Sequence, residues 1–546
     1  MARMTTARAI VRSLVANGVD TLFGLPGVQL DALFNALHDE RDRIRIIHPR
    51  HEQAAAYMAL GYAQASAKVG AYVVVPGPGI LNTTAALATA WGACAPVLAI
   101  TGQLPAPAIG QGYGLLHEIP DQLAILRTLT KWAGRIEHPT QAAERMRDAF
   151  HQLRSGVPRP VAIESPMDVL GFEADIEGIE AASPAAPIAP DAGAVDEAAK
   201  LLASAESPVI VVGGGALHAG DALRAVAETL QAPVIAHRMG RGILDDRHPL
   251  SVTQPAGAKL WKHADAVLAV GTRLRHYRAE WGAAGLPIVR IDLDPTQMHR
   301  LGRPAVPIVA DARLALEALS TALGPLAGQR TPRSEEIESI KTAAHQEMLS
   351  GAGAQIEFLD ALRAALPEDG IFVDEMTQMG YVAQSAFPVH APRTFLSTGY
   401  QGTLGAGFPT ALGAQVACPD RAVLSINGDG GFMFNVQELS TAVQQGLGVV
   451  AVVFEDDAYG NVKRMQEELY DGRVIASELH NPDFVRLAES FGAAAVRVDT
   501  PGALRDTVAA AWGRSVPTVV CVRVGRFPDP FDAVLPTKAV RPRQGH

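Results

Sequence analysis

The sequence has few of the residues that mark secreted, membrane-spanning or nucleic-acid-binding proteins. Its three cysteines stand alone and form no Cys-x-x-Cys pair, which argues against a disulfide framework and a structural zinc site. No run approaches the roughly 18 to 20 apolar residues needed to cross a bilayer, and the N-terminus has no apolar signal core. The formal net charge of −10 provides no basic field for nucleic acid or an anionic membrane. These absences predict a cytoplasmic protein with no nucleic-acid and no membrane partner.

The residues that are present are typical of a large α/β protein. Hydrophobic residues make up 48% and charged residues 19% of the chain, which excludes a largely disordered protein. Aromatic residues are only 5%, while there are 51 glycines, and this mix suits many tight strand-to-helix turns better than a β-sandwich. At roughly 150 residues per domain, a chain of 546 residues predicts three or four domains.

Two proline- and alanine-rich stretches, 181–192 and 323–335, have the composition of linkers. They divide the chain into blocks 1–180, 193–322 and 336–546. In each block four short apolar runs alternate with helical patterns, which predicts parallel strands with helices on both faces of the sheet. The predicted strands are 21–25, 44–49, 71–75 and 97–101 in the first block, 209–212, 234–236, 266–270 and 288–291 in the second, and 371–373, 422–426, 449–454 and 518–522 in the third. The helical patterns of the first block are 29–38, 52–66 and 80–92. We therefore predict an α/β protein with three doubly wound parallel-sheet domains.

The most informative stretch, 421–460, reads as a strand, a glycine-rich turn, a helix, a second strand and an acidic turn. Its first turn, 428–431, is Gly-Asp-Gly-Gly, where the backbone can approach an anion closely. Asp429 and Asp456 each follow a strand end, and parallel strands end at the sheet edge where ligands bind. Mg²⁺ prefers oxygen ligands and combines one or two carboxylates with substrate phosphates. Two ordinary acidic turns are the alternative, but the spacing favours a metal–diphosphate site.

This stretch resembles the thiamine-diphosphate signature of the acetolactate synthase, pyruvate oxidase and benzaldehyde lyase superfamily. The resemblance implies that Asp429, Asp456 and the backbone carbonyl of Ala458 bind Mg²⁺. Relatives usually carry two consecutive asparagines where this chain has Glu455 and Asp456. Aspartate can still bind Mg²⁺, whereas the resemblance gives Glu455 no role.

A glutamate in the first block matches a second element of the same family. Glu52 follows a predicted strand and begins a predicted helix, in the sequence His-Glu-Gln-Ala-Ala. A glutamate in a first helical turn is commonly only favourable with the helix dipole. The resemblance implies more: the family glutamate at this junction protonates N1′ of the aminopyrimidine, so that the 4′-imino group removes the thiazolium C2 proton.

Further matches extend the resemblance over nearly the whole chain. It implies that Pro78 and Asn82 lie close to the cofactor pyrimidine. It also implies that the Gly402 carbonyl accepts a hydrogen bond from the 4′-amino group, and that the Leu404 side chain separates the two cofactor rings. The remaining predicted cofactor contacts are in the last block: Thr377, Gln378, Gly428, Asp429, Gly430, Gly431, Asp456, Tyr459 and Gly460.

The predicted substrate pocket comes from three segments. His117, after Leu116, occupies the position of an active-site glutamine in related enzymes, and its imidazole could move protons on the substrate. Gln29, after Val28, occupies the position of a benzaldehyde lyase histidine. Met465 stands where biosynthetic acetolactate synthases carry a tryptophan that favours a larger acceptor, which argues against a branched-chain amino-acid role.

The middle block contains a glycine triplet, 213–215, after a predicted strand. No acidic residue ends the next strand, where His237 follows Ala236, so the dinucleotide signature is incomplete. The segment between Ser251 and Ala264 is also shorter than in flavin-binding relatives. We expect a structural middle domain, with FAD as the less favoured alternative.

The sequence therefore predicts an acetolactate synthase-like enzyme that depends on thiamine diphosphate and Mg²⁺. It would cleave or decarboxylate a 2-keto acid and transfer the resulting acyl carbanion to an acceptor carbonyl. The alternatives are a hydroxyketone or 2-hydroxyacyl-CoA lyase, or a non-catalytic cofactor-binding paralogue. In the family, the groups corresponding to Glu52 and Asp429 come from different subunits, which implies a homodimer or homotetramer with active sites at subunit interfaces.

Overall fold

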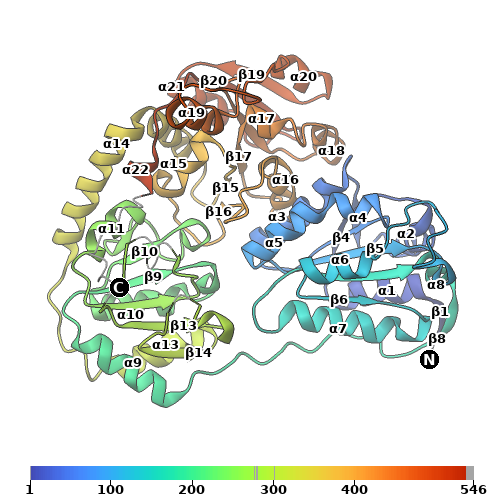
Figure 1. Ribbon diagram of the computed structural model, residues 1–546, viewed down its shortest axis with the longest axis horizontal. Coiled ribbons are helices and arrows are strands. Elements are labelled where there is room, and N and C mark those ends of the chain that lie inside the picture. The colour runs from blue at the N-terminus through green and yellow to red at the C-terminus, as the bar shows by residue number, and fades with distance from the viewer. Residues whose placement is uncertain (1, 276, 278–280, 284, 301, 536–546) are drawn as a thin grey trace.

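The computed structural model describes residues 2–275, 277, 281–283, 285–300 and 302–535, and it contains three parallel sheets (Figure 1). Over these residues each sheet has six strands, and the fold class predicted from the sequence is confirmed. A short antiparallel pair, β1 (Ala2–Thr5) and β8 (Glu173–Ile176), joins the two ends of the first domain. The long helix α14 (Ser334–Ala365) runs along the left edge of Figure 1, from the middle domain to the third.

The first sheet has the order β3–β2–β4–β5–β7–β6. Its strands are β2 (Thr21–Gly24), β3 (Arg45–Ile47), β4 (Gly70–Val74), β5 (Val97–Gln103), β6 (Trp132–Arg135) and β7 (Val161–Pro166). Its helices are α1 (Thr6–Ala16), α2 (Asp31–Asp39), α3 (Glu52–Ser66), α4 (Pro78–Asn82), α5 (Thr84–Ala93), α6 (Gln122–Leu129), α7 (Ala142–Arg154) and α8 (Met167–Gly171).

The middle sheet has the order β11–β10–β9–β12–β13–β14. Its strands are β9 (Pro208–Val212), β10 (Val234–Ala236), β11 (Ser251–Val252), β12 (Ala266–Val270), β13 (Ile288–Asp292) and β14 (Val306–Val309). Its helices include α9 (Ala192–Ser204), α10 (Gly220–Leu230), α11 (Gln254–Trp261) and α13 (Ala312–Leu323).

The third sheet has the order β16–β15–β17–β18–β20–β19. Its strands are β15 (Ile371–Val373), β16 (Phe395–Leu396), β17 (Val423–Gly428), β18 (Val450–Glu455), β19 (Ala494–Val498) and β20 (Thr518–Arg523). Besides α14, its helices are α15 (Gln378–Ala386), α16 (Gly407–Ala417), α17 (Asp429–Phe432), α18 (Glu438–Gln445), α19 (Gly460–Leu469), α20 (Phe484–Ser490), α21 (Pro501–Ala509) and α22 (Phe531–Val534).

Alternating side chains of the strands build separate cores on the two faces of each outer sheet. On β4, Tyr72 and Val74 face the core shared with α3 and α5, whereas Ala71 and Val73 face the core with α1 and α7. This alternation follows from the two-residue repeat of a β-strand. Strands buried on both faces explain the nearly continuous apolar runs in the sequence.

The first and third domains share one of these cores, because α3 packs closely against α16 (Figure 1). A Cβ atom on Gly61 would lie 2.0 Å from the Thr410 carbonyl oxygen, and one on Gly413 would lie 1.9 Å from the Met58 carbonyl oxygen. Only glycine permits this approach of the two helix backbones. The pairing brings the beginning of α3, where Glu52 lies, next to the third domain.

The differences from the sequence prediction are local. Four strands of each sheet were predicted, whereas β6 and β7 of the first sheet and the short or edge strands β11, β14, β16 and β19 were not. A single helix predicted over 80–92 is two helices, α4 and α5, which meet at Thr83. In the part of the chain that the structure describes, no helix is both long and apolar enough to cross a membrane.

Candidate active site

The turn after β17 is organised by the carboxylate of Asp429, which is 1% exposed. Its Oδ1 accepts a hydrogen bond from the Gly430 amide at 2.7 Å. Its Oδ2 accepts from the amides of Asp457 at 2.8 Å and Asp456 at 3.2 Å, which follow β18. One carboxylate therefore ties together the turns at the ends of two neighbouring parallel strands.

Asp456, which is partly buried, carries the second carboxylate of this group, and its Oδ2 accepts a hydrogen bond of 2.7 Å from Gln378 Nε2. Burial, and then the nearby charge of Asp429, raise the pKa of Asp456 to about 6. Burial also raises the pKa of Asp429, although its hydrogen bonds to backbone amides oppose this. Two neighbouring carboxylates, one buried and one partly buried, favour the binding of a cation between them.

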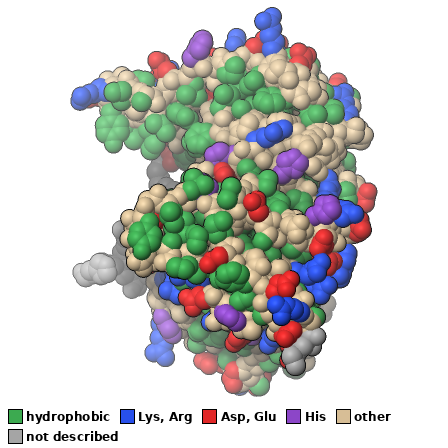
Figure 2. All heavy atoms as spheres, turned by 90° about the vertical axis from the view of Figure 1, so that its right-hand side faces the viewer, with side chains coloured by type: hydrophobic (Ala, Val, Ile, Leu, Met, Phe, Trp, Pro, Cys, Tyr) green, Lys and Arg blue, Asp and Glu red, His purple; other side chains and the backbone are tan. Residues whose placement is uncertain are grey.

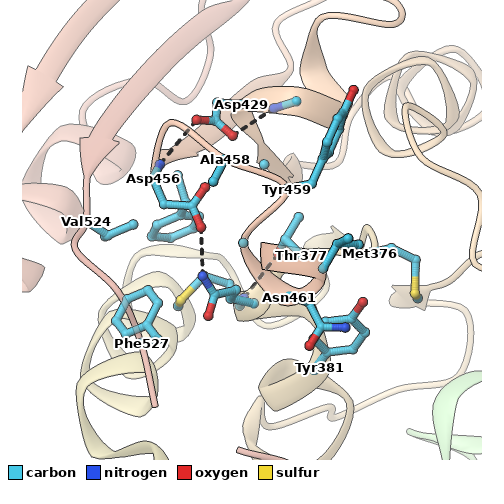
Figure 3. A pocket seen from close by; sticks show the side chains of 18 of the residues that line it. Met376, Thr377, Tyr381, Asp429, Asp456, Ala458, Tyr459, Asn461, Val524 and Phe527 are labelled. Carbon is cyan, nitrogen blue, oxygen red and sulfur yellow. Dashed lines mark hydrogen bonds between the residues drawn. The ribbon is translucent and has the colours of Figure 1, made fainter. Parts of the chain in front are cut away.

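A cavity of about 280 Å³ lies beside these carboxylates, and its lining comes entirely from the third domain (Figure 3). Eleven residues predicted from the sequence line it: Thr377, Gln378, Leu404, Gly428, Asp429, Gly430, Gly431, Asp456, Ala458, Tyr459 and Gly460. Apolar residues that the sequence analysis did not single out complete the lining, among them Met376, Phe454, Val524 and Phe527. The structure thus brings the predicted diphosphate-end residues together.

Close packing explains two glycines of this site. A Cβ atom on Gly460 would lie 2.1 Å from Asp456 Oδ2 and 2.4 Å from Gln378 Nε2. A Cβ atom on Gly430 would lie 2.7 Å from the Tyr459 ring. Side chains here would therefore displace the groups that line the cavity.

The donor atoms suit a hard cation held together with a phosphate group. Among the described residues, no three His, Cys, Asp or Glu side chains form a metal-binding group. The two carboxylates and the backbone at Ala458 are oxygen donors, and Mg²⁺ commonly completes such a set with water and substrate phosphates. Asp457, between Asp456 and Ala458, has φ of +52°, an uncommon conformation that tends to be retained at functional sites.

The segment 399–405 passes the same cavity in a backbone conformation that depends on glycine. Gly402 and Gly405 have φ of +59° and +76°, a region that favours glycine, and Leu404 between them lines the cavity. The Gly405 amide donates a hydrogen bond to the fully buried carboxyl group of Glu375. Burial raises the pKa of Glu375 to about 8, so this side chain stays largely protonated near neutral pH.

In the first domain, Glu52 is the first residue of α3 and its carboxylate is partly exposed. Asn82, the last residue of α4, donates a hydrogen bond of 3.0 Å from its Nδ2 to Glu52 Oε2. Pro78 is the first residue of α4, a position where its missing N–H costs nothing. All three residues were predicted from the sequence, and they lie at one edge of the first domain.

Buried hydrogen bonds connect the loop before α4 to Gln122 and Glu164. Gly77 has φ of +58°, and its amide donates to Gln122 Oε1 at 2.9 Å. Gln122 Nε2 donates to the buried Glu164 carboxylate at 2.8 Å. A Cβ atom on Gly77 would lie 2.3 Å from the His117 carbonyl oxygen, so the loop also packs against the predicted substrate segment.

Gln29 and His117, predicted separately from the sequence, contact each other. Gln29 Oε1 lies 3.1 Å from His117 Nδ1, and Gln29 Nε2 donates to the Leu116 carbonyl oxygen at 3.2 Å. Gln29 is buried, whereas Val28 and Leu116 beside the pair are 58% and 63% exposed. Figure 2 views the molecule from the side of the first domain, and hydrophobic side chains gather on the upper part of that face. His117 adopts φ of +69°, which is uncommon for a residue with a side chain.

The predicted residues thus form two groups. The third-domain group lines the cavity, and the first-domain group surrounds the loop 76–82. Among the described residues, no first-domain residue lines the cavity. Met465 lies on α19 and is 44% exposed.

Glu455, which the sequence left without a role, is a buried partner of Arg497 on β19. The Arg497 guanidinium lies 2.9 Å from both carboxylate oxygens of Glu455. Glu455 is 4% exposed, whereas the Arg497 side chain is 32% exposed. The pair joins β18 to β19, next to Cys521 on the strand between them, and accounts for a charged residue at the end of β18.

Sequence reasoning missed several residues that organise the site. Asn481 Nδ2 donates to Asp429 Oδ2 at 2.7 Å and to Asp457 Oδ1 at 3.0 Å. Asn481 lies 52 positions after Asp429 in a loop, so no local spacing indicated this contact. Glu375 and Gln122 were missed for the same reason. The one sequence signal for Glu375 was its place two positions after the predicted strand 371–373.

The glycine triplet of the middle domain has a packing explanation. A Cβ atom on Gly213 would lie 2.5 Å from the Gly271 carbonyl oxygen, and one on Gly215 would lie 2.7 Å from Gly271 Cα. The turns after β9 and β12 therefore touch through their backbones. Glycine is required here whether or not the domain binds a ligand.

Comparison with known proteins gives matches in all three domains. Residues 4–125 match the thiamine pyrophosphate enzyme N-terminal TPP binding domain, residues 195–319 the central domain, and residues 375–522 the C-terminal TPP binding domain. The chain is 35% identical to a probable 2-ketoarginine decarboxylase of Pseudomonas aeruginosa, over 95% of this chain and 94% of that protein. It is 33% identical to a probable acetolactate synthase large subunit of Methanococcus aeolicus, over 92% and 89%. It is 31% identical to acetolactate synthase isozyme 3 large subunit of Escherichia coli, over 94% and 92%.

Proposed function

The chain belongs to the thiamine pyrophosphate enzyme family, and we propose that it acts on a 2-keto acid with Mg²⁺ as the second cofactor. It is an acetolactate synthase-like enzyme of the decarboxylase and carboligase kind. The observation that carries the proposal is the third-domain cavity, where Asp429 and Asp456 lie side by side (Figure 3). The reaction removes CO₂ from the keto acid and either releases an aldehyde or transfers the acyl unit to an acceptor carbonyl.

The third domain would hold the diphosphate end of the cofactor. Asp429, Asp456 and the carbonyl of Ala458 would provide the protein ligands of Mg²⁺, and their oxygen donors suit that ion. The other contacts in this proposal come from the cavity lining and the segment beside it: Thr377, Gln378, Gly402, Leu404, Gly428, Gly430, Gly431, Tyr459 and Gly460. The backbone hydrogen bonds to Asp429 and the close packing around Gly430 and Gly460 support a preformed site.

The first domain would hold the pyrimidine end. When bound, thiamine diphosphate supplies an electron sink for the carbon–carbon bond that breaks. Glu52 would exchange a proton with the pyrimidine nitrogen N1′, Asn82 would orient the Glu52 carboxyl, and Pro78 would fix the loop beside it. The 3.0 Å hydrogen bond from Asn82 to Glu52 supports this arrangement.

His117 and Gln29 would act at the substrate end of the site. His117 would donate or accept a proton at the substrate oxygen, and Gln29 would hold the imidazole through the 3.1 Å contact. Val28, Leu116 and Met465 would form the apolar part of the pocket, which their exposed side chains in a single chain support.

The domain roles form part of the same proposal. Residues 1–180 would bind the pyrimidine, residues 193–322 would form the middle domain, and residues 336–546 would bind the diphosphate. Because the two candidate groups lie apart within one chain, the proposal pairs them across subunits of a homodimer or homotetramer. The packing of the glycine triplet supports a structural middle domain over one that binds FAD. The three free thiols support a reducing, cytoplasmic location.

The test is to incubate the protein with thiamine diphosphate, Mg²⁺ and a panel of 2-keto acids, including some with cationic side chains. Release of CO₂ and formation of ligated product are measured separately, which distinguishes decarboxylase from carboligase. Hydroxyketones and 2-hydroxyacyl-CoA compounds test the lyase alternative. If no keto acid is consumed, the proposed function is wrong.

A further inference from the structure

The backbone just before Glu52 is held by a carboxylate of the third domain. Glu438, the first residue of α18, is fully buried. Its Oε1 accepts hydrogen bonds from the amides of Arg50 and His51, both at 3.1 Å. Its Oε2 lies 3.0 Å from the Arg50 amide and also accepts from the Thr441 hydroxyl at 2.6 Å. Both oxygens of this carboxylate therefore have partners, and two of those partners are backbone groups of the first domain.

These two amides belong to the residues that lead into α3. His51 is the N-cap of α3, and its side-chain Nδ1 accepts from the Gln53 amide at 3.1 Å. N–H groups at the start of a helix lack partners within the helix, and an anion beside them is favourable with the helix dipole. Glu438 thus accepts hydrogen bonds from the backbone N–H groups immediately before Glu52, although it belongs to another domain.

We propose that Glu438 is a positioning residue for Glu52: by holding the entry to α3, it fixes where the Glu52 carboxyl meets the cofactor. The inference rests on the role proposed for Glu52. Asn82 holds the Glu52 side chain, and Glu438 holds the backbone of Arg50 and His51 directly before Glu52, so the carboxyl is positioned from two sides. Glu438 touches neither substrate nor cofactor and acts through Glu52.

The same stretch of the third domain also links Glu438 to the turn that carries Asp429. Asp429 begins α17, and Glu438 lies nine positions further on, at the start of α18. Asn435, between them, is buried and donates to the Gly405 carbonyl oxygen at 2.6 Å. One short stretch therefore carries the diphosphate-end carboxylate at its beginning and the group that holds α3 at its end. Burial raises the pKa of Glu438, while the hydrogen bonds from Thr441, Arg50 and His51 oppose this and favour the charged form.

The test combines Glu438→Gln with Glu52→Gln. A glutamine has only one acceptor oxygen, so Glu438→Gln cannot accept from both amides and Thr441 as the carboxylate does. We expect turnover to fall about 10-fold, which corresponds to about 1.4 kcal/mol. The Kd for thiamine diphosphate, measured by quenching of protein fluorescence, should stay within about 2-fold, since Glu438 touches no cofactor atom. Hydrogen–deuterium exchange at C2 of the bound cofactor, followed by NMR, should slow by the same factor as turnover.

The double variant separates positioning from general stability. If Glu438 acts through Glu52, then adding Glu438→Gln to Glu52→Gln slows C2 exchange no further, because coupled residues are not additive. The proposal would be overturned if Glu438→Gln slowed C2 exchange equally in the wild type and in Glu52→Gln, or if it raised the Kd for thiamine diphosphate. A Glu52→Gln variant that exchanges and turns over as the wild type does would instead overturn the proposed function, without involving Glu438.

A matched control comes from the same helix. Gln444 on α18 contacts the first domain through His48 at 3.1 Å, and His48 lies before the two residues that Glu438 holds. Gln444→Ala should leave turnover and C2 exchange within about 2-fold of the wild type, and an equal loss in this variant would overturn the proposal. If Glu438→Gln does not fold, Thr441→Val perturbs the same carboxylate from its other side. It should slow C2 exchange about 3-fold at unchanged Kd, and unchanged exchange would count against Glu438.

Discussion

The two candidate halves of the active site differ in how completely one chain builds them. In the third domain, the predicted residues line one cavity, and Asp429 is almost fully buried under hydrogen bonds from backbone amides. In the first domain, Glu52 is partly exposed, and Val28 and Leu116 expose most of their surface. Large exposed apolar side chains beside candidate catalytic groups indicate a surface that another surface completes. The proposed diphosphate half is therefore preformed, whereas the proposed pyrimidine half would be completed by a partner subunit.

This comparison assigns different tasks to the two halves: the third domain should determine cofactor affinity, and the first domain should determine turnover. The largest expected effect is that of Glu52→Gln. Loss of a positioned proton-transfer group typically costs about 10² to 10⁴-fold in rate, so turnover should fall by that factor. The Kd for thiamine diphosphate should change little, because Asp429 and the cavity are intact.

Steady-state kinetics at saturating cofactor give the turnover of Glu52→Gln, and a fluorescence titration gives its Kd for thiamine diphosphate. Glu137→Gln, at an exposed glutamate of the same domain, is the control and should behave as the wild type. Unchanged turnover in Glu52→Gln would remove the assignment of the first domain to catalysis.

The opposite pattern is expected for Asp429→Asn. The substitution keeps the size of the side chain but removes one of two carboxylates that would bind Mg²⁺. The Kd for thiamine diphosphate in the presence of Mg²⁺ should rise about 10- to 100-fold, the range typical of damaged metal sites. At saturating cofactor much of the turnover should return.

Titration with and without a chelator distinguishes the metal from the diphosphate. The wild type should lose affinity when the divalent cation is removed, whereas Asp429→Asn should lose less. If the variant binds the cofactor as tightly as the wild type, the cavity is not the diphosphate site.

A smaller effect is expected at the substrate end of the first domain. His117→Ala should lower kcat/KM about 10-fold, which corresponds to about 1.4 kcal/mol of transition-state stabilisation. Gln29→Ala should cost less, since Gln29 acts by holding the imidazole at 3.1 Å. In the double variant the two losses should not add. Additive losses would show that Gln29 and His117 contact the substrate independently.

Site residues that stand next to a predicted strand or in a recognisable motif could be predicted from the sequence. Residues that contact them from a distant loop or from another domain could not. Asp429 and Asp456 could be predicted because each directly follows a strand, and parallel strands bring such turns to one edge. Asn481 and Glu438 could not, since each reaches its partner from a distant loop or another domain. Prediction of the strands also depended on a local sequence pattern. Central strands are long apolar runs, whereas β11 and β16 have two residues each and leave no pattern.

The smallest effect on activity is expected from Arg497→Ala, which tests whether Glu455 belongs to the active site or to the sheet. Both oxygens of the buried Glu455 carboxylate lie 2.9 Å from the Arg497 guanidinium. Removing Arg497 leaves a buried carboxylate without this partner and should destabilise the folded state by about 1–3 kcal/mol. Cofactor affinity and turnover should stay within about 2-fold, because the Glu455 carboxylate pairs with β19 and does not line the cavity.

Scanning calorimetry of Arg497→Ala and of the double variant Glu455→Gln/Arg497→Ala provides the measurement. Replacing both partners should cost less than replacing Arg497 alone, because the uncompensated buried charge is then gone. If Arg497→Ala melts as the wild type does but binds thiamine diphosphate and Mg²⁺ more weakly, Glu455 is a third carboxylate of the metal site. The acidic pair at 455–456 would then change the charge of that site rather than the stability of the sheet. Glu455 would then belong to the third-domain site and not to the sheet that supports it.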